Sequence, residues 1–282
     1  MNAVLSRLPL TRLRIAVAGI LYRLVHLVYR NDHRVVTRRG IIYELDLREG
    51  IDFAVFVSGN FQGHVSDSKH LGLGPDAVVI DVGANCGVVT LQYAKAAPAG
   101  KVFAFEPTTY AFTKLQRNLE LNPELAKNIV ATQLFVSDST DATDLEAYAS
   151  WRVSGGSGEP THRVHGGTTK PTEGIGAVTL DAFCVERGLD RLDLIKIDTD
   201  GHELEVLRGA REVLRTYRPV VVFEIGLYLL ADRNVDFRDY LRLFDALDYR
   251  VFDITGRHEL DASNFTAHLP QQSTVDLLAR PQ

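Results

Sequence analysis

The chain has 282 residues, of which 45% are apolar and 24% are charged, a composition that is ordinary for a globular protein and excludes global disorder. Its formal net charge is −5, from 31 Lys and Arg against 36 Asp and Glu, so it lacks the basic excess of a generic nucleic-acid-binding protein. Two cysteines, Cys86 and Cys184, are too few for a disulfide framework and favour a reducing, cytoplasmic compartment.

Residues 1–33 are expected to form an N-terminal amphipathic helix. The apolar run at 15–22 is far shorter than the roughly 20 residues of a membrane span, and we identify no cleaved targeting segment. Two interpretations stay open for residues 10–30: peripheral contact with an anionic membrane, or packing of the apolar stripe on the domain. The stripe consists of Leu13, Val17, Ile20, Leu24, Leu27 and Val28, and the basic face of Arg12, Arg23, His26 and Arg30.

Residues 34–75 are interpreted as a β-rich extension, because strand formers flank Gly40 and predict a hairpin. Residues 76–282 are interpreted as the main domain of a single compact unit. Alternating strands and helices there predict an α/β fold with a doubly wound, mostly parallel sheet that helices cover on both faces. The predicted strands are 78–84, 101–107, 129–137, 192–198, 219–226, 249–254 and 273–279, and the predicted helices are 86–97, 108–121, 201–217 and 236–247.

The segment D-V-G-A-N-C-G at 81–87 lies between the first predicted strand and a helix. Ligands of open α/β sheets bind at the carboxyl ends of the strands, and glycine lets the backbone approach a ligand closely. The pattern is not G-x-G-x-x-G, which disfavours a dinucleotide. An acidic residue at this turn suits an amino-bearing ligand such as the methionine part of S-adenosylmethionine. The residues predicted to bind this donor are Asp81, Gly83, Asn85 and Gly87.

Two further donor contacts are predicted at the ends of the next strands. Glu106 follows Asp81 by 25 residues, a position from which a carboxylate accepts hydrogen bonds from a ribose diol. Ser137 and Asp138 follow the third strand, where a carboxylate accepts from an adenine amino group or, equally, caps a helix. Residues 139–177, rich in glycine, interrupt the alternation and are interpreted as a functional lid or a mobile segment.

The segment I-K-I-D-T-D-G-H-E at 195–203 places carboxylates and a histidine at the end of a central strand, and Glu224 ends the neighbouring one. Crowded carboxylates raise one another's pKa, and a histidine exchanges a proton near neutral pH. A hydroxyl acceptor needs such a base when the methyl group is transferred. The predicted catalytic residues are His202, Asp198, Asp200 and Glu224. The same side chains are compatible with a divalent cation, although we predict no metal ligand.

These segments resemble the FkbM family of methyltransferases in their order and spacing: D-V-G-A-N-C-G with F-E-P, then V-T-L-D-A-F, then L-I-K-I-D-T-D-G-H-E-L-E-V-L-R-G-A, then R-P-V-V-V-F-E-I. The resemblance covers roughly residues 40–255, and Y-E-L-D-L-R-E-G-I-D at 43–52 is similar to the family's N-terminal extension. One departure is Asp200, because many members have D-V-E-G where this chain has residues 198–201. The shorter side chain reduces its reach.

The resemblance implies a Rossmann-like, S-adenosylmethionine-dependent O-methyltransferase. Its acceptor would be a small molecule or glycan: the hydroxyl of a sugar, a glycoconjugate or a secondary metabolite. By motif position the residues of the glycine turn and Glu106 would bind the donor, and the second cluster would line the acceptor side. A rival hypothesis is an inactive methyltransferase-fold scaffold at a membrane surface. A nucleic-acid methyltransferase is disfavoured, because no N-P-P-Y-type motif is present.

Overall fold

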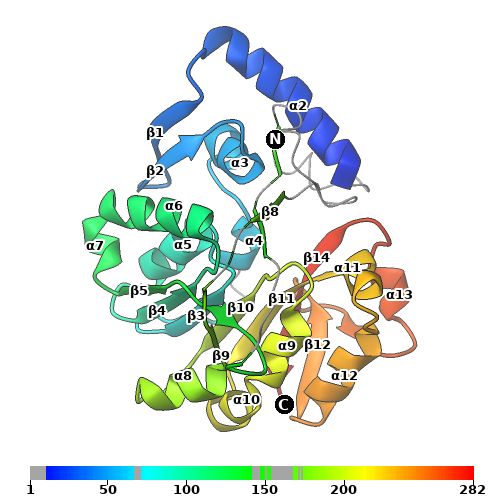
Figure 1. Ribbon diagram of the computed structural model, residues 1–282. Helices are drawn as coiled ribbons and strands as arrows, with labels where there is room; N and C mark the ends of the chain where they lie inside the picture. Colours follow the sequence, from blue (N-terminus) through cyan, green and yellow to red (C-terminus); the bar gives the residue numbers. More distant parts are fainter. Residues whose placement is uncertain are drawn as a thin grey trace.

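The computed structural model describes residues 11–66, 71–141, 147–149, 151–153, 168–170, 172 and 174–282. Its centre is an eight-stranded sheet in the order β13-β12-β14-β11-β10-β3-β4-β5 (Figure 1). The strands of this sheet are β3 (Val78–Val82), β4 (Lys101–Phe105), β5 (Ile129–Thr132), β10 (Leu194–Ile197), β11 (Val220–Gly226), β12 (Tyr249–Asp253), β13 (Glu259–Leu260) and β14 (Thr274–Pro281). The smaller sheets pair β1 (His33–Arg38) with β2 (Ile41–Asp46), β6 (Phe135–Val136) with β9 (Ala177–Val178), and β7 (Ala147–Ala149) with β8 (Thr168–Lys170).

Helices cover both faces of the central sheet, as the alternating pattern predicts. They are α2 (Thr11–Val28), α3 (Gly50–Ser58), α4 (Gly63–Ser66), α5 (Val88–Ala96), α6 (Thr109–Glu120), α7 (Pro123–Ala126), α8 (Leu180–Glu186), α9 (Glu203–Arg208), α10 (Arg211–Tyr217), α11 (Leu227–Asp232), α12 (Phe237–Asp245) and α13 (Phe265–His268). Thr108 caps α6 by accepting a hydrogen bond from the backbone of Ala111.

The sheet is doubly wound, which confirms the predicted fold class. From β3 the chain builds β4 and β5 on one side, and it then returns to place β10 and β11 on the other side, all in parallel. The order of strands therefore reverses between β3 and β10, which is where ligands of open α/β sheets bind. In this sheet, antiparallel pairing is confined to the far edge, where β14 pairs with β11 and β12, and β12 pairs with β13.

Two predicted elements are divided in the structure. The strand expected at 129–137 is split into β5, in the central sheet, and β6, which pairs with β9. The helix expected at 201–217 breaks at Gly209 into α9 and α10. A side-chain Cβ at Gly209 would lie 2.1 Å from the carbonyl oxygen of Ser137, so only glycine permits this close approach of two backbones.

Alternation along the strands divides the interior into two hydrophobic cores. Ile195 and Phe223 face the core beneath α8, α9, α10 and α12. Leu194 and Val222 face the opposite core, which includes residues of α5 and of the N-terminal extension. Tyr43 and Phe53, both from the extension, belong to this second core. The extension is thus packed on the same face of the sheet as α5.

The predicted hairpin is confirmed, since β1 and β2 pair antiparallel around Arg39 and Gly40, which both have positive φ angles. The hairpin is followed, however, by two helices, α3 and α4, and the described residues of the extension after it contain no further strand. The apolar residues of α3 pack inward at Phe53 and Val55. The description of 34–75 as β-rich therefore holds for its first part only.

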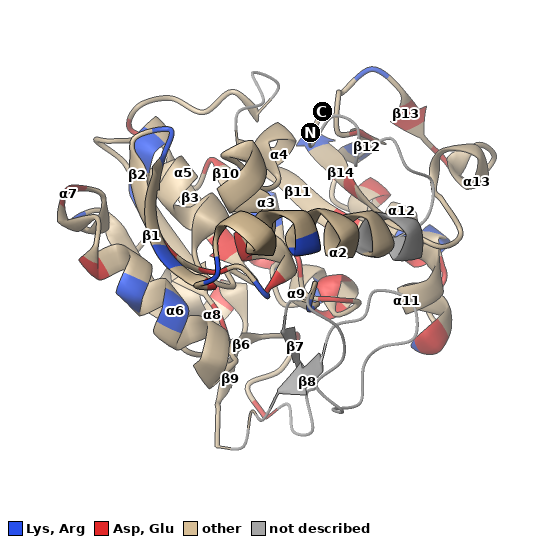
Figure 2. Cartoon of the chain, turned by 90° about the horizontal axis from the view of Figure 1, so that it is seen from above, with Lys and Arg blue, Asp and Glu red and all other residues tan. Residues whose placement is uncertain are grey.

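Helix α2 does not pack the apolar stripe that its sequence pattern defines. It buries Ala18 and Tyr22 instead, and it leaves Ile20, Leu24 and Leu27 between 56% and 77% exposed. The interpretation that this stripe packs on the domain is therefore wrong for its residues between 20 and 28. Figure 2 looks onto α2, which lies across this end of the molecule. Within the described ranges, no helix has both the length and the apolar character that a membrane span requires.

Candidate active site

The turn after β3 occupies the switch point of the sheet. Gly83, Asn85 and Gly87 have φ angles of 75°, 49° and 82°, in the left-handed region that favours glycine and asparagine. The amides of Gly83 and Ala84 both donate to the carbonyl oxygen of Phe105, at the end of β4, at 2.9 Å. A Cβ on Gly83 would lie 1.8 Å from the carbonyl oxygen of Asp198, after β10. The turn is therefore fixed between the ends of three strands.

Glu106 lies against this turn, as the predicted donor site requires. Its Oε2 accepts the backbone amide of Asn85 at 2.9 Å. Its Oε1 accepts the amide and the hydroxyl of Thr108, at 2.9 and 2.6 Å. Burial raises the pKa of Glu106 above its usual value, and these hydrogen bonds offset only part of the shift. A carboxylate offers about four lone pairs. These three hydrogen bonds leave one acceptor position, and its use by a ribose hydroxyl stays a prediction.

Asp81 differs from the expectation that it faces a ligand. Its side chain is fully buried beneath the turn. It accepts the hydroxyl of Thr90 at 2.6 Å, and its Oδ1 lies 3.1 Å from Nζ of Lys196. Lys196 also donates to the carbonyl oxygen of Gly83 at 2.9 Å. Asp81 therefore supports the glycine turn through Lys196, a residue that the sequence analysis did not single out.

Strand register brings three carboxylates into one row at the carboxyl edge of the sheet. Asp198 lies two residues beyond Lys196, so it continues the same face of the sheet. Glu224 lies two residues beyond Val222, the partner of Lys196, and pairs directly with Asp276 of β14. The row Asp198, Glu224 and Asp276 therefore faces the side that α4 and α5 cover.

Residues 62–64, which precede α5, contact this row through their side chains. Gln62 donates to Oδ2 of Asp198 at 2.9 Å. Two residues later, Nε2 of His64 lies 2.5 Å from Oδ2 of Asp276. Gln62 and His64 thus engage the two outer carboxylates of the row, on either side of Glu224. The sequence analysis missed His64, Gln62 and Asp276, because they belong to no motif and only the fold brings them to this edge.

Burial and neighbouring charges favour the protonated forms of two carboxylates at this edge. The pKa of Glu224 is raised well above its usual range by burial and by the charges of Asp198 and Asp276. The pKa of Asp200 is raised in the same way, by burial and then by Asp198 and Glu203. Oε1 of Glu203 accepts the amides of Thr199 and Gly201, so it holds the turn that carries Asp200.

Three other predicted site residues lie apart from this row. Nε2 of His202 is 3.1 Å from a guanidinium nitrogen of Arg233, which is itself paired with Glu205. Ser137 is buried and Asp138 is exposed after β6. No helix begins within described residues 138–141, so the alternative role of Asp138 as a cap finds no support there. Its contact with adenine stays a prediction.

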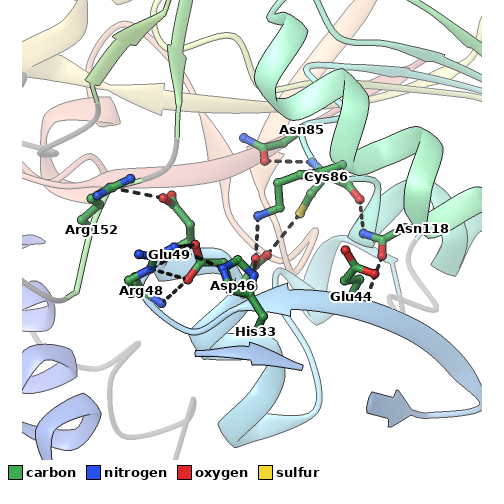
Figure 3. Close-up of polar contacts among 11 residues, drawn as sticks. His33, Glu44, Asp46, Arg48, Glu49, Asn85, Cys86, Asn118 and Arg152 are labelled. Carbon is green, nitrogen blue, oxygen red and sulfur yellow. Dashed lines mark hydrogen bonds and ion pairs between the residues drawn. The ribbon is translucent and has the colours of Figure 1, made fainter. Parts of the chain in front are cut away.

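The N-terminal extension closes the outer side of the glycine turn, as Figure 3 shows. Asn118 of α6 donates to the carbonyl oxygen of Cys86 at 2.8 Å and accepts the amide of Glu44 at 2.9 Å. Fully buried Asp52 accepts the amide of Asp46 and pairs with Nζ of Lys114. These contacts join β2, α3 and α6 around the turn.

One stretch of the chain's long glycine-rich segment can be located next to the N-terminal extension. Residues 151–153 run beside residues 48–50, with Glu49 lying 3.5 Å from Nε of Arg152. A Cβ on Gly50 would meet the ring of Trp151 at 2.3 Å, so the ring lies directly on the glycine. Most of the predicted lid at 139–177 lies outside the described residues, and its role stays a prediction.

Burial raises the pKa of Cys86 to about 12, which suits a packing residue rather than a nucleophile.

No metal centre is found in the part of the chain that the structure describes, where no three His, Cys, Asp or Glu side chains are arranged to hold an ion. The residues at the switch point form a glycine turn next to a buried carboxylate with one acceptor position left. When bound there, S-adenosylmethionine would supply a sulfonium methyl group. Gly83, Asn85 and Glu106 are the residues placed to hold it.

Comparison with known proteins agrees with this arrangement. The model of the methyltransferase FkbM domain matches residues 81–251. Among curated relatives, methyltransferase sdnD of Sordaria araneosa is 29% identical over 62% of this chain and 79% of its own length. The 2-O-methyltransferase NoeI of Sinorhizobium fredii is 28% identical, over 51% of this chain and 61% of its own. The hexuronic acid methyltransferase AglP of Haloferax volcanii is 29% identical, over 52% and 55%.

Among solved structures, the methyltransferase FkbM from Methylobacillus flagellatus KT aligns with 75% of this chain and 45% of its own, at 18% identity and a TM-score of 0.49. The family model covers more than half of this chain and includes the glycine turn, Glu106 and the carboxylates of β10 and β11. The chain therefore belongs to the FkbM family of S-adenosylmethionine-dependent methyltransferases.

Proposed function

We propose that this chain transfers a methyl group to a hydroxyl of a sugar, a glycoconjugate or a secondary metabolite. The observation that carries the proposal is the row Asp198, Glu224 and Asp276. This row lies beside the glycine turn at the carboxyl edge of the sheet. This row of carboxylates suits an acceptor that presents hydroxyl groups, because carboxylates accept hydrogen bonds from them. The names of NoeI and AglP, which specify 2-O-methylation and a hexuronic acid, support this class of acceptor.

Asp198, Asp200 and Glu224 are proposed to line the acceptor side. Asp198 is held by Gln62 and Lys196, so it is positioned before an acceptor arrives. Glu224 in its protonated form would donate a hydrogen bond to the acceptor. We do not assign the proton of the acceptor to His202, whose ring nitrogen contacts Arg233.

A transfer assay tests this proposal. The full chain, with methyl-labelled S-adenosylmethionine, is incubated with fractionated glycans, glycolipids and small metabolites of the source cell, with and without a chelator. We expect label on an alkali-stable ether in a sugar or metabolite fraction, equally with the chelator. Label found only on protein, nucleic acid or a nitrogen atom would refute the hydroxyl acceptor, and loss of transfer with the chelator would reveal a metal.

Replacement of Glu106 by glutamine tests the donor site. We expect Glu106→Gln to weaken binding of S-adenosylhomocysteine by about 10- to 100-fold, because a hydrogen bond to a charged group contributes roughly 1.5–3 kcal/mol. The new amide would also oppose the amide of Asn85 or Thr108. Glu120→Gln, at an exposed glutamate at the end of α6, serves as the control. Isothermal titration calorimetry measures both, and equal affinities would remove Glu106 from the donor site.

We further propose that α2 holds the enzyme at an anionic membrane surface. Six of the eight exposed large hydrophobic side chains in the described residues lie between 20 and 35: Ile20, Leu24, Leu27, Val28, Tyr29 and Val35. Arg23 and Arg30 are exposed beside them. Asp32, an acidic residue of this region, is engaged by Tyr22 and His26. An apolar stripe flanked by arginines matches an interfacial helix on anionic lipids.

Vesicle co-sedimentation tests this contact. The chain is expected to sediment with vesicles that contain phosphatidylglycerol and to remain in the supernatant with phosphatidylcholine alone. The double variant Leu24→Glu, Leu27→Glu should reduce binding by at least about tenfold, since each leucine contributes roughly 1.5–3 kcal/mol when fully buried. Val185→Glu, at an equally exposed apolar residue of α8, should bind like the wild type. Equal sedimentation of all three proteins would argue against a role for α2.

A further inference from the structure

The structure contains a histidine–aspartate pair at the carboxyl edge that no motif of the sequence marks. His64 of α4 contacts Asp276 of β14 through Nε2, at 2.5 Å. The Asp276 side chain is 10% exposed, whereas that of His64 is 54% exposed. The carboxylate is thus fixed within the sheet, and part of the imidazole stays accessible. We propose that His64 accepts the hydroxyl proton of the acceptor and that Asp276 is its positioning residue, an inference that rests on the proposed O-methyl transfer.

Short helix α4 holds His64 firmly above the sheet. Val65 is fully buried in the core that α5 shares. The hydroxyl of Ser66 donates to Gln92 of α5, and Gln92 donates to Asn60 at 2.9 Å. A Cβ on Gly63 would lie 1.7 Å from the side-chain nitrogen of Asn60, so the Asn60 side chain packs directly on this turn. The contact with Asp276 therefore joins two elements that are each fixed independently.

The other side chains at this edge are less suited to take up the hydroxyl proton of the acceptor. Asp198 already accepts from Gln62 and lies 3.5 Å from the ammonium of Lys196, so its charge is stabilised by partners within the protein. Glu224 favours its protonated form, because it lies between Asp198 and Asp276. A protonated carboxyl group donates a hydrogen bond but takes up no proton. His64 is the group that titrates near neutral pH beside this row.

The arrangement also explains how the proton would be stabilised. With Nε2 engaged by Asp276, the hydroxyl proton would pass to Nδ1, for which the structure records no partner among the described residues. The acceptor oxygen forms a bond to the methyl carbon, and the carbon–sulfur bond of the donor breaks with its electron pair left on sulfur. The imidazolium that results is paired with Asp276, the role an aspartate has in hydrolytic triads. Water then takes the proton from Nδ1.

The pH dependence follows from the charges around His64. Asp276 raises the pKa of His64 above its usual value, although burial opposes the shift. The other titratable groups at this edge are Glu224 of β11, which favours its protonated form, Lys196 of β10, and Asp198 directly after β10. A base must be neutral, so the rate is expected to rise with pH and to level off above the raised pKa. Asp276→Asn removes the stabilising charge and should move this inflection to lower pH while it reduces kcat.

The test compares the full chain with His64→Gln, whose amide keeps a donor near Nε2 but takes up no proton. We expect kcat for label transfer to the most active cell fraction to fall by roughly 100- to 10,000-fold. Affinity for S-adenosylhomocysteine should stay at the wild-type value. His258→Gln is the matched control: His258 contacts Asp253 at 2.6 Å and is 63% exposed, but Asp253 continues the face of Val251, on the opposite side of the sheet.

Nuclear magnetic resonance of histidine-labelled protein gives a readout that needs no acceptor. The resonances of His64 should titrate above the usual histidine value in the wild type and return toward it in Asp276→Asn. An unchanged titration in Asp276→Asn, or a His64→Gln variant that transfers label at the wild-type rate at every pH, would overturn the inference alone. A wild-type chain that binds no S-adenosylhomocysteine would instead overturn the proposed function.

Discussion

Gly83→Ala is expected to abolish donor binding and to destabilise the chain by at least about 2–5 kcal/mol, or to prevent folding. The new Cβ would lie 1.8 Å from the carbonyl oxygen of Asp198, and a backbone atom cannot rotate away as a side chain does. Relief would require β3 and β10 to move apart at the switch point. In a close-packed interior such overpacking costs at least roughly 1–3 kcal/mol, and the positive φ of Gly83 adds about 1–2 kcal/mol.

Gly188→Ala separates these two contributions. Gly188 also has a positive φ, of 60°, but a Cβ there would meet no atom within 4 Å. Its replacement should cost only the conformational part, about 1–2 kcal/mol, and should leave affinity for S-adenosylhomocysteine unchanged. Urea unfolding and calorimetry measure both effects. Similar losses of stability in the two variants would mean that the contact with Asp198 is not what requires glycine at position 83.

The pattern of the sequence was sufficient to predict the central sheet and the place of the donor turn. Buried runs such as 78–84 and 219–226 are long and apolar because helices cover both faces, and this signal is local. The contact between the glycine turn and Glu106 also follows from the topology of successive parallel strands. What local patterns could not supply was the splitting of the helix at Gly209, which packs against a carbonyl group more than 70 residues earlier in the chain.

The row of carboxylates beside the glycine turn was predicted only in part, because some of its members and partners are brought there by the tertiary fold alone. Asp198 and Glu224 end recognisable strands, but their partners are Gln62, directly before α4, and Asp276 of β14, both far away in the chain. The antiparallel register that sets Asp276 beside Glu224 depends on tertiary pairing. For α2, helical periodicity identified an apolar stripe correctly, but periodicity alone does not tell which face a helix buries.

Lys196 is the residue whose importance was hardest to foresee, since a lysine inside an apolar strand gives no indication of its partner. Its side chain is 4% exposed and that of Asp81 is not exposed at all. Burial lowers the pKa of the ammonium, but the charges of Asp81 and Asp198 outweigh burial and raise it overall. Lys196 also donates to the carbonyl oxygen of Gly83, so one ammonium connects the turn with both aspartates.

Lys196→Met is therefore expected to destabilise the chain by about 3–5 kcal/mol, because removal of one partner leaves the other charge buried without compensation. Asp81→Asn in the same chain should restore part of this loss, since the fully buried side chain at position 81 then carries no charge. Lys127→Met, at an exposed pair with Glu124, should change stability by no more than about 1 kcal/mol. Urea unfolding of the four proteins gives the comparison. If Lys196→Met unfolds like Lys127→Met, or if Asp81→Asn worsens the loss, the ammonium does not hold Asp81 beneath the glycine turn.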